Sequence, residues 1–235
     1  MATGSCSRSR KLDWQAVELT LRLAGFTTLS LVVLGTPIAW WLATTRRPWR
    51  GLVHALVALP LVLPPTVLGF YLLLAMGPDG PIGMLTTSLG LDRLPFTFAG
   101  ILVASVIYSL PFMVQPLTVA FSGVDRALLE ASWTLGRSGV GTFFRVVVPL
   151  SAQGFLTAAV LTFAHTVGEF GVVLMIGGSI PGVTRTVSIS IYDDVQALDY
   201  ASAAALAFPL LVASFVVLAI TYTVARRRIE WPIGA

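Results

Sequence analysis

The chain has 235 residues, of which 56% are hydrophobic and only 11% are charged, and its mean hydropathy is +0.85. Soluble domains carry about a quarter charged residues, so this composition excludes an ordinary soluble protein and indicates a polytopic membrane protein. The formal charge of +4 comes from basic residues in polar segments, which favours a role in membrane topology over nucleic-acid binding. A single cysteine, Cys6, excludes an intrachain disulfide.

Five apolar runs are long enough to cross about 30 Å of hydrocarbon, which takes about 20 helical residues. They cover residues 19–44, 52–76, 96–121, 150–176 and 201–224. The sequence therefore predicts an all-α membrane protein, a polytopic bundle of about five transmembrane helices. We expect a polar N-terminal segment at 1–18, with a short surface helix at 12–19 before the first span. A transmembrane domain at 19–224 and a C-terminal tail at 225–235 should follow.

The basic residues separate into two groups when the five spans are threaded across a bilayer. Nine arginines fall on one side and six basic residues on the other, although the six include the basic N-terminal segment. The larger group comprises Arg46, Arg47, Arg50, Arg126, Arg137, Arg145, Arg226, Arg227 and Arg228. Because loops rich in Lys and Arg stay in the cytoplasm, we expect the N-terminus outside and the C-terminus inside a bacterial-type inner membrane.

A polar segment at 122–149 joins the third and fourth apolar runs and is predicted to lie in the cytoplasm. Asp125 can cap a helix by accepting hydrogen bonds from free backbone N–H groups. Gly136 can adopt a positive φ and end that helix, and a second short helix is expected at 140–146. Pro149 would lie in the first turn of the fourth span. These residues predict a helical hairpin outside the membrane, but an ordinary interfacial loop explains them equally well.

The pattern in this segment resembles the EAA signature of ABC importer permeases, which reads Glu-Ala-Ala, three residues, Gly, and later Leu-Pro. Here a serine replaces the second alanine and valines replace the later Ile and Leu. The matching segment includes Glu130, Ala131, Ser132, Leu135, Gly136 and Pro149. The resemblance implies that 122–149 contains a cytoplasmic coupling helix, which docks in a groove on a separate ABC ATPase.

Three further blocks resemble molybdate ABC transporter permeases and follow in the expected order. They are Leu-Pro-Leu-Val-Leu-Pro-Pro from residue 59, Gly-Glu-Phe-Gly from residue 168, and the segment 180–192. The resemblance implies a molybdate importer with two cytoplasmic ABC ATPase subunits and an external substrate-binding protein. Tungstate and sulfate permeases are similar, so these oxyanions are alternatives. No cofactor is expected on this chain, because the partner ATPase would use ATP and Mg.

Prolines interrupt the second apolar run, where Pro60, Pro64 and Pro65 fall close together. Each lacks a backbone donor and disturbs the preceding helical turn, so the freed carbonyls must face protein or a water-filled cavity. We therefore expect a bent helix that lines the translocation pathway, with Thr66 beside the bend. A static packing kink is the alternative, because proline is common in membrane helices.

Glu169 is the only acidic residue deep within an apolar run, and ionisable residues in such places are costly and often functional. His165 lies one helical turn earlier and could form a proton relay or a metal pair with it, although two ligands are too few for a metal site. We expect instead that Glu169 joins neighbouring helices by hydrogen bonds and stabilises a gate without binding substrate. Gly168 and Gly171 would allow close helix approach. A purely structural role is the alternative.

The segment at 184–200 shows two competing periodicities. A partial helical stripe consists of Val187, Ile191, Val195 and Leu198, while residues 187, 189 and 191 also alternate as in a strand. We expect an amphipathic helix at the outer surface. With the acidic residues Asp193, Asp194 and Asp199 it would form a docking rim for the binding protein; an interfacial helix without a partner is the alternative.

Enzyme classes fit the sequence poorly. Lys11 is the only lysine, so the chain contains no Gly-x-x-x-x-Gly-Lys phosphate loop and no ATPase site of its own. It also lacks a Gly-x-Ser-x-Gly motif. We expect no catalytic residues, no metal and no nucleic-acid partner. Because five spans form a small bundle, a pathway is easier to build between two copies of the chain. An ATPase-independent secondary transporter or channel is the rival class, and an intramembrane hydrolase is a weaker one.

Overall fold

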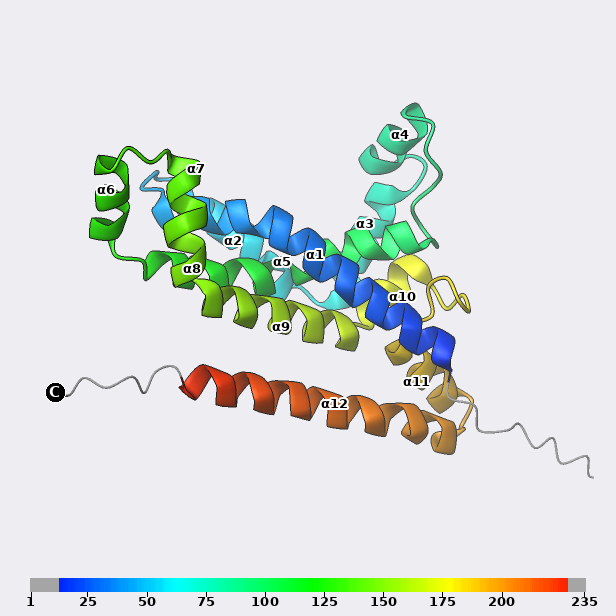
Figure 1. The fold of residues 1–235 in the computed structure, drawn as a ribbon. Coiled ribbons are helices and arrows are strands. Elements are labelled where there is room, and N and C mark those ends of the chain that lie inside the picture. Colours follow the sequence, from blue (N-terminus) through cyan, green and yellow to red (C-terminus); the bar gives the residue numbers. More distant parts are fainter. Residues whose placement is uncertain (1–12, 228–235) are drawn as a thin grey trace, which may run out of the picture.

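The computed structural model describes residues 13–227, and every regular element in that part of the chain is helical (Figure 1). The longer helices are α1 (Trp14–Thr44), α2 (Arg50–Val62), α3 (Pro65–Met76), α5 (Phe98–Ser122), α9 (Ala152–Gly168), α11 (Val187–Gln196) and α12 (Tyr200–Arg227). The shorter ones are α4 (Pro81–Ser88), α6 (Arg126–Thr134), α7 (Gly139–Thr142), the π-helical turn η1 (Phe143–Val147), α8 (Val148–Leu150) and α10 (Gly171–Gly177). The predicted all-helical architecture is confirmed. Most of the predicted N-terminal segment and tail, at 1–12 and 228–235, lies outside the described residues.

Four helical stretches of residues 13–227 are long and apolar enough to cross a bilayer, and a bent pair would make five. The four are Trp14–Thr44, Pro65–Ser88, Phe98–Ser122 and Tyr200–Ala219. The bent pair is Gly139–Leu150 with Ala152–Gly168. This agrees with the expected number of spans. The separate surface helix expected at 12–19 is wrong, because α1 runs unbroken from Trp14, directly after its N-terminal cap at Asp13.

The second apolar run forms two helices with an extended link, where the sequence predicted one bent span. α2 ends at Val62, and both Leu63 and Pro64 adopt extended backbone angles before α3 begins at Pro65. A proline ring disfavours helical angles at the residue before it, and two consecutive prolines impose this restriction on both link residues. Pro65 is the first residue of α3, where its missing N–H leaves no bond unmade. The span predicted at 52–76 is therefore corrected to a broken one.

The fourth apolar run is divided twice, so the single span predicted at 150–176 is also wrong. Near its start, the helices on either side of Ser151 are bent by 74°. Pro149 lies in α8, ahead of this bend, and not in the first turn of the long helix. Proline clashes with the carbonyl four residues earlier, and the π-helical turn η1 directly before α8 absorbs such a mismatch. Near its end, α9 stops at Gly168 and α10 begins at Gly171.

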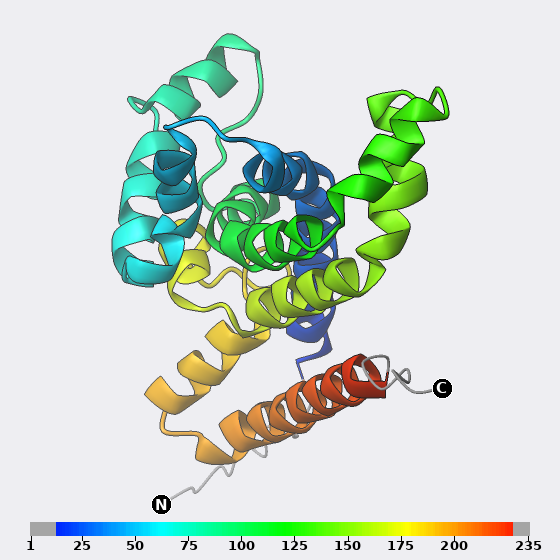
Figure 2. The same ribbon diagram turned by 90° about the vertical axis from the view of Figure 1, so that its left-hand side faces the viewer.

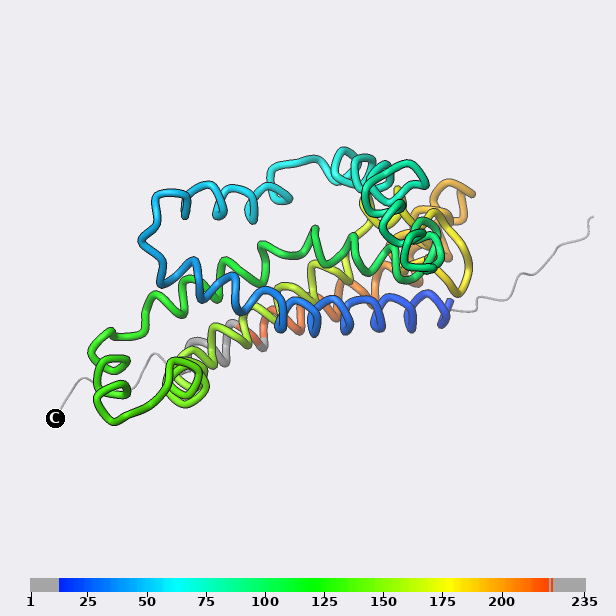
Figure 3. The backbone as a smooth tube through the Cα atoms, turned by 90° about the horizontal axis from the view of Figure 1, so that it is seen from above, coloured from blue at the N-terminus to red at the C-terminus, as the bar shows by residue number. Residues whose placement is uncertain are grey.

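The centre of the bundle consists of α1, α5 and α9 (Figure 1). α1 and α5 run in the same direction, and α9 runs the opposite way, as the view from above shows (Figure 3). Gly35 brings α1 close to α5, because a Cβ at this position would lie 2.9 Å from Met113 Cγ. Buried apolar side chains fill the space between the helices in two clusters, one around Leu117 and the other around Ile101. Hydrophobic packing thus holds these three helices in a fixed register.

The two ends of the bundle carry different elements. The segment with α6 and α7 projects at one end, where the link between α1 and α2 also lies (Figure 1). Both carry arginines of the larger basic group, among them Arg46, Arg47 and Arg137. The short helices α4, α10 and α11 lie at the opposite end (Figure 1). The fold therefore brings these arginines to one end, as the sequence predicted.

α12 lies along the outside of the bundle, and Figure 2 shows it set apart from the central helices. It packs mainly against α11 and α9. Only 11% of its most apolar stretch is buried, and the side chains of Phe208, Leu211 and Phe215 are exposed. Within a membrane, such a surface faces lipid or another protein subunit.

The close approach of α5 and α9 predicts a specific loss of stability. A Cβ at Gly154 would overlap the Cβ of Ala120, so Gly154→Ala must push the two helices apart. Overpacking of this kind costs about 1–3 kcal/mol, and each kcal/mol lowers the melting temperature of a chain of this size by about 2–4 °C. Thermal unfolding in lipid nanodiscs measures the shift.

Gly25→Ala is the matched control, because a Cβ at Gly25 of α1 would meet nothing within 4 Å. Alanine also favours the helix over glycine, so this variant should melt at the parent temperature or above it. If Gly154→Ala is as stable as Gly25→Ala, the close packing of α5 and α9 is wrong.

Candidate functional site

The segment at 122–149, which we call the hairpin, stands out from one end of the bundle as two short helices joined by a tight turn (Figure 2). α6 begins after Asp125, whose carboxylate accepts a hydrogen bond of 2.9 Å from the backbone N–H of Ala127. Gly136 has φ +78°, and a Cβ there would meet nothing within 4 Å. The left-handed backbone, and not a lack of space, therefore requires glycine at this turn. The predicted helix between Asp125 and Gly136 is present.

Two polar contacts fix the residues of the Glu-Ala-Ser motif. Ser132 is buried, and its hydroxyl lies 2.9 Å from the hydroxyl of Thr142, which ties α6 to α7. Glu130 accepts a hydrogen bond of 2.9 Å from Arg126 one turn earlier. Because both members of this ion pair are exposed, it adds little stability. Ser132, the small residue of the motif, thus joins the two helices of the hairpin. The spacing of the motif alone did not reveal this role.

The outer surface of the hairpin is rich in exposed apolar side chains. These are Leu128, Trp133, Leu135, Val140 and Phe144. Ala131 is exposed beside them. The hairpin projects beyond the end of the bundle, so these side chains are placed where a protein partner could cover them. Exposed apolar patches with a polar surround are typical of protein docking sites.

The proline-rich link between α2 and α3 lies against α10. A Cβ at Gly171 would lie 2.8 Å from the Cβ of Pro65, and a Cβ at Gly69 would lie 2.8 Å from the Cβ of Met175. Glycines at both positions therefore permit the contact between α3 and α10. Gly168 differs, because a Cβ there would meet nothing within 4 Å among residues 13–227, so the close approach expected at this glycine is not found within the described chain.

The other predicted pathway residues differ in exposure. Pro60 is buried within α2. Pro64, Pro65 and Thr66 are exposed in the single chain. They lie in the broken second span, about halfway along the apolar run. Their exposure leaves this face open to water, lipid or another protein chain.

Glu169 lies at the break between α9 and α10 with extended backbone angles. Its side chain is only 4% exposed. Neither carboxylate oxygen makes a hydrogen bond of normal geometry among residues 13–227, although the hydroxyl of Ser105 in α5 lies near the carboxyl group. The expected hydrogen bonds to neighbouring helices are therefore not formed directly with normal geometry. The expectation that His165 lies one turn before Glu169 on the same helix is also wrong, because α9 ends at Gly168.

His165 has its own partners within the bundle. Its Nδ1 lies 2.9 Å from the hydroxyl of Ser109, which in turn lies 3.0 Å from the hydroxyl of Thr166. The ring stacks on Phe112 with the centroids 3.9 Å apart. In the described part of the chain, no group of three or more His, Cys, Asp and Glu side chains could hold a metal ion. The imidazole therefore joins α9 to α5.

Acidic groups gather at the end opposite the hairpin, around α11. Asp193 accepts a hydrogen bond of 2.5 Å from Ser179 and lies 3.5 Å from Arg185. Partial burial raises the pKa of Asp194 above its usual range, and the neighbouring negative charges raise it further. Arg185 opposes this rise. Like charges are thus held close together at this surface.

α11 itself confirms the helix expected within 184–200 and excludes the strand. The predicted apolar stripe is only partly correct. Val187 is buried, whereas Val195 is 41% exposed and Leu198 is 74% exposed. Leu198 follows the end of the helix and has φ +60°, so the stripe ends before the turn into α12.

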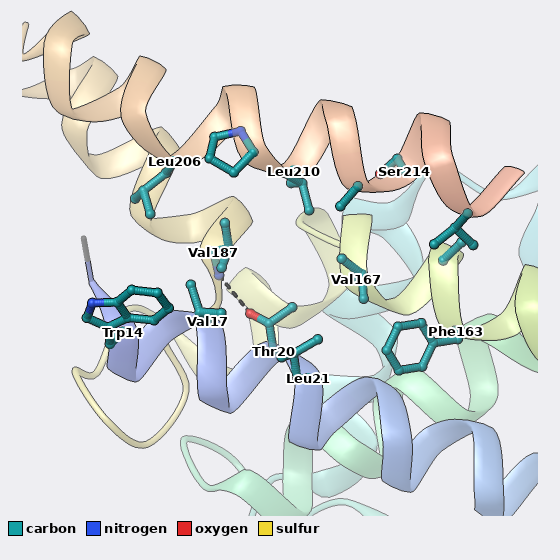
Figure 4. A pocket seen from close by; sticks show the side chains of 14 residues that line it. Trp14, Val17, Thr20, Leu21, Phe163, Val167, Val187, Leu206, Leu210 and Ser214 are labelled. Carbon is teal, nitrogen blue, oxygen red and sulfur yellow. Dashed lines mark hydrogen bonds between the residues drawn. The ribbon is translucent and has the colours of Figure 1, made fainter. Parts of the chain in front are cut away.

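An apolar groove of about 360 Å³ lies between α1, α9, α11 and α12 (Figure 4). Its walls include Trp14, Phe163 and Leu210. At one side the hydroxyl of Thr20 accepts a hydrogen bond of 2.9 Å from the backbone N–H of Val187, so this polar group is already engaged. An oxyanion needs hydrogen-bond donors or positive charge, and the apolar walls do not supply them. This groove is therefore unsuited to bind a small anion.

Comparison with known families assigns the chain. Residues 35–230 match the family described as "Binding-protein-dependent transport system inner membrane component". The chain belongs to this family. Its matched region contains α2 to α12, and so includes the hairpin and both broken runs.

Individual relatives of this transport component are close. The chain is 61% identical over 214 residues to the "Molybdenum transport system permease protein ModB" of Azotobacter vinelandii, covering 91% of this chain and 95% of that protein. It is 34% identical over 214 residues to a "Probable sulfate transport system permease protein cysT" of Nephroselmis olivacea, covering 91% and 75%. A solved bacterial alginate ABC transporter in complex with a periplasmic protein matches with a TM-score of 0.75 and 18% identity, covering 95% of this chain and 81% of that one. The last match shows the shared fold.

Sequence reasoning on this transport component missed the contacts that depend on register between helices. The bond between Ser132 and Thr142 joins residues ten positions apart, and that between Ser109 and His165 spans fifty-six. No local pattern reveals such pairs. The break at Glu169 had a local signal, the glycines on both sides of Glu169-Phe170, which was interpreted as helix packing.

Proposed function

We propose that this chain is the membrane permease subunit of an ATP-driven, binding-protein-dependent importer of molybdate. The observation that carries this proposal is the hairpin, a helix–glycine–helix unit with exposed apolar side chains in a chain that belongs to a binding-protein-dependent transport family. The identity of 61% to a molybdenum permease supports the substrate. Tungstate and sulfate are the alternative oxyanions.

Energy for transport comes from a separate cytoplasmic ATPase in this proposal. The chain has no phosphate-binding loop, so ATP and Mg would be bound by two ABC ATPase subunits. The hairpin, with Glu130, Ala131, Ser132, Leu135 and Gly136, is the docking element for them. At the end of the hairpin, the π-helical turn and Pro149 lead into the bend before α9. Movement of the ATPase would therefore be transmitted directly into a membrane helix.

The working unit is a homodimer in this proposal. The exposed apolar surface of α12 and the exposed link at Pro64, Pro65 and Thr66 offer surfaces for a second copy. A pathway between two copies needs only one twofold axis. Pro60, Pro64, Pro65 and Thr66 would line it. Gly168, Glu169 and Gly171 would form the gate at the break between α9 and α10, without binding the substrate themselves.

The two ends of the bundle would face different compartments. The hairpin end carries the larger group of arginines, so we place it in the cytoplasm together with the C-terminus, and the N-terminus outside. The opposite end, with α11 and its acidic groups Asp193, Asp194 and Asp199, would then receive the external binding protein. Burial raises the pKa of Asp194 and the neighbouring carboxylates raise it further. A partner with basic groups would offset this repulsion between like charges, which supports docking at this surface.

Uptake by the assembled transporter tests the substrate and the energy source. The permease is reconstituted in vesicles with its partner ATPase and binding protein, and labelled molybdate uptake is followed. We expect uptake only with ATP, with strong competition by unlabelled molybdate and weak competition by sulfate. Uptake driven by the permease alone would identify a secondary transporter and overturn the proposal; stronger competition by sulfate would reassign the substrate.

The hairpin predicts that Gly136→Val uncouples transport. A β-branched residue at φ +78° costs about 1–3 kcal/mol of backbone strain, so the turn should distort. We expect several-fold lower uptake and weaker co-purification of the ATPase, while membrane insertion is unchanged. Gly139→Val is the matched control, because a Cβ at Gly139 meets nothing within 4 Å and the backbone there is not left-handed. Full uptake by Gly136→Val would show that the hairpin is not the coupling element.

The proposed pathway predicts solvent access at Thr66. In a Cys6→Ser background, Thr66→Cys should react with a membrane-impermeant thiol reagent, and the rate should change several-fold when nucleotide is added. Phe215→Cys, on the exposed apolar face of α12, is the control and should stay unreactive if that face contacts lipid or protein. A Thr66→Cys variant that is equally unreactive in every nucleotide state would place this link outside the pathway.

A further inference from the structure

Six buried polar side chains carry oxygen atoms without a hydrogen-bond partner among the described residues: Thr27, Ser105, Ser151, Thr162, Glu169 and Thr186. Three of the six belong to the elements around the α9–α10 break. They are Thr27 of α1, Ser105 of α5 and Glu169 at the α9–α10 break. Thr27 and Ser105 are 0% exposed, and Glu169 is 4% exposed. Buried polar groups are almost always satisfied, by protein or by ordered water. Three unmet groups therefore require an explanation, above all if they lie together.

The register between α5 and α9 brings Ser105 and Glu169 together. The two helices run in opposite directions, Gly154 lies against Ala120, and Ser109 bonds to Thr166. One helical turn further from the hairpin, α5 presents Ser105 in place of Ser109. Over the same distance, α9 passes from Thr166 to the region of Glu169. The hydroxyl of Ser105 accordingly lies near the Glu169 carboxyl group, but the two do not meet the geometry of a direct hydrogen bond.

The register between α1 and α5 places Thr27 at the same level. These helices run in the same direction, with Gly35 packed on Met113. Both helices rise by the same amount per residue. Thr27 lies eight residues before Gly35, and Ser105 lies eight residues before Met113, so the two residues are at the same level. The three unmet groups thus come from three different elements and lie at one depth of the bundle.

Thr27 also differs from the other threonines of α1. The hydroxyls of Thr20, Thr28, Thr36 and Thr44 each donate to the backbone carbonyl four residues earlier. That bond is the usual way in which a threonine in a membrane helix satisfies its hydroxyl. Thr27 is the exception in α1, although it is completely buried. Its hydroxyl is therefore available to a partner between the helices.

We propose that Thr27, Ser105 and Glu169 surround an internal water molecule, which satisfies their unmet hydrogen bonds at the α9–α10 break. A buried water typically makes about three hydrogen bonds to otherwise unmet polar groups, which matches this set. Two hydroxyls and a carboxyl group supply both donors and acceptors. The site also explains how extended backbone persists at this depth, since non-helical segments within a membrane occur where protein or water satisfies them. This inference does not depend on the transported substrate.

Isosteric substitution distinguishes a hydrated site from an empty one. Thr27→Val keeps the shape and removes the hydroxyl. If water bonds to Thr27, the full-length permease in lipid nanodiscs should melt lower by about 2–4 °C. If the hydroxyl is truly unpaired, its removal should leave the melting temperature unchanged or raise it, and the proposal fails. Thr28→Val is the matched control, because its hydroxyl bonds only to its own helix.

A double-mutant cycle tests whether the groups share one ligand. Thr27→Val and Ser105→Ala should be less than additive in their shift of melting temperature, whereas Thr28→Val and Ser105→Ala should be additive. Additive effects of Thr27→Val and Ser105→Ala would mean that no common water exists. Glu169→Gln keeps the size and most of the hydrogen bonding, so it should retain the stability that Glu169→Ala loses. Equal losses in these two variants would overturn the role of Glu169.

An electron-microscopy map of the complete transporter at a resolution that shows ordered water identifies the ligand directly. We expect a density peak within hydrogen-bonding distance of Thr27, Ser105 and Glu169, and its loss in the Thr27→Val variant. Direct contact between the three side chains without intervening density would overturn the water site.

Discussion

The bilayer offers no hydrogen-bond partner to the backbone, and this constraint accounts for most of the structure. Each apolar run must satisfy its N–H and C=O groups within itself, so the runs fold as helices. Where a run cannot stay helical, other parts of the chain cover the irregular segment. The proline link before α3 is covered on one side by α10, where Gly171 lies against Pro65, while its other side remains exposed in the single chain. The break at Glu169 is enclosed by the bundle.

α9 is the mechanical connection between the two ends of the permease. At one end it follows the hairpin through the bend of 74°, and at the other it stops at the Glu169 break. Between these points Gly154 fits tightly against Ala120, and Ser109 bonds to His165 and Thr166. Such close packing leaves little room for α9 to slide along α5. If the hairpin is displaced, α9 and α5 would therefore move together, and this movement would extend to the break at Glu169.

The hairpin is rigid for reasons that lie in its polar groups. Asp125 caps α6, Ser132 bonds to Thr142, and Gly136 supplies the left-handed turn between the helices. Its apolar side chains remain exposed, because the bundle has no surface of its own to cover them. A defined helical element with an uncovered apolar face is better suited to dock on another protein than a loop without regular structure would be. The ion pair between Arg126 and Glu130 is exposed and contributes chiefly to the shape of that surface.

The sequence by itself determined the helical class, the number of apolar runs, the hairpin and its glycine turn, because these depend on composition and on local backbone preferences. Cap residues such as Asp125 and the φ preference of Gly136 act within a few positions of the chain. The tertiary structure alone decided that the runs at 52–76 and 150–176 are broken, that Gly171 and not Gly168 is a packing glycine, and that Ser132 bonds to Thr142. It also decided that Glu169 has left the helix of His165. Each of these depends on register between helices, which hydrophobic periodicity does not specify, since lipid-facing and core-facing side chains are equally apolar.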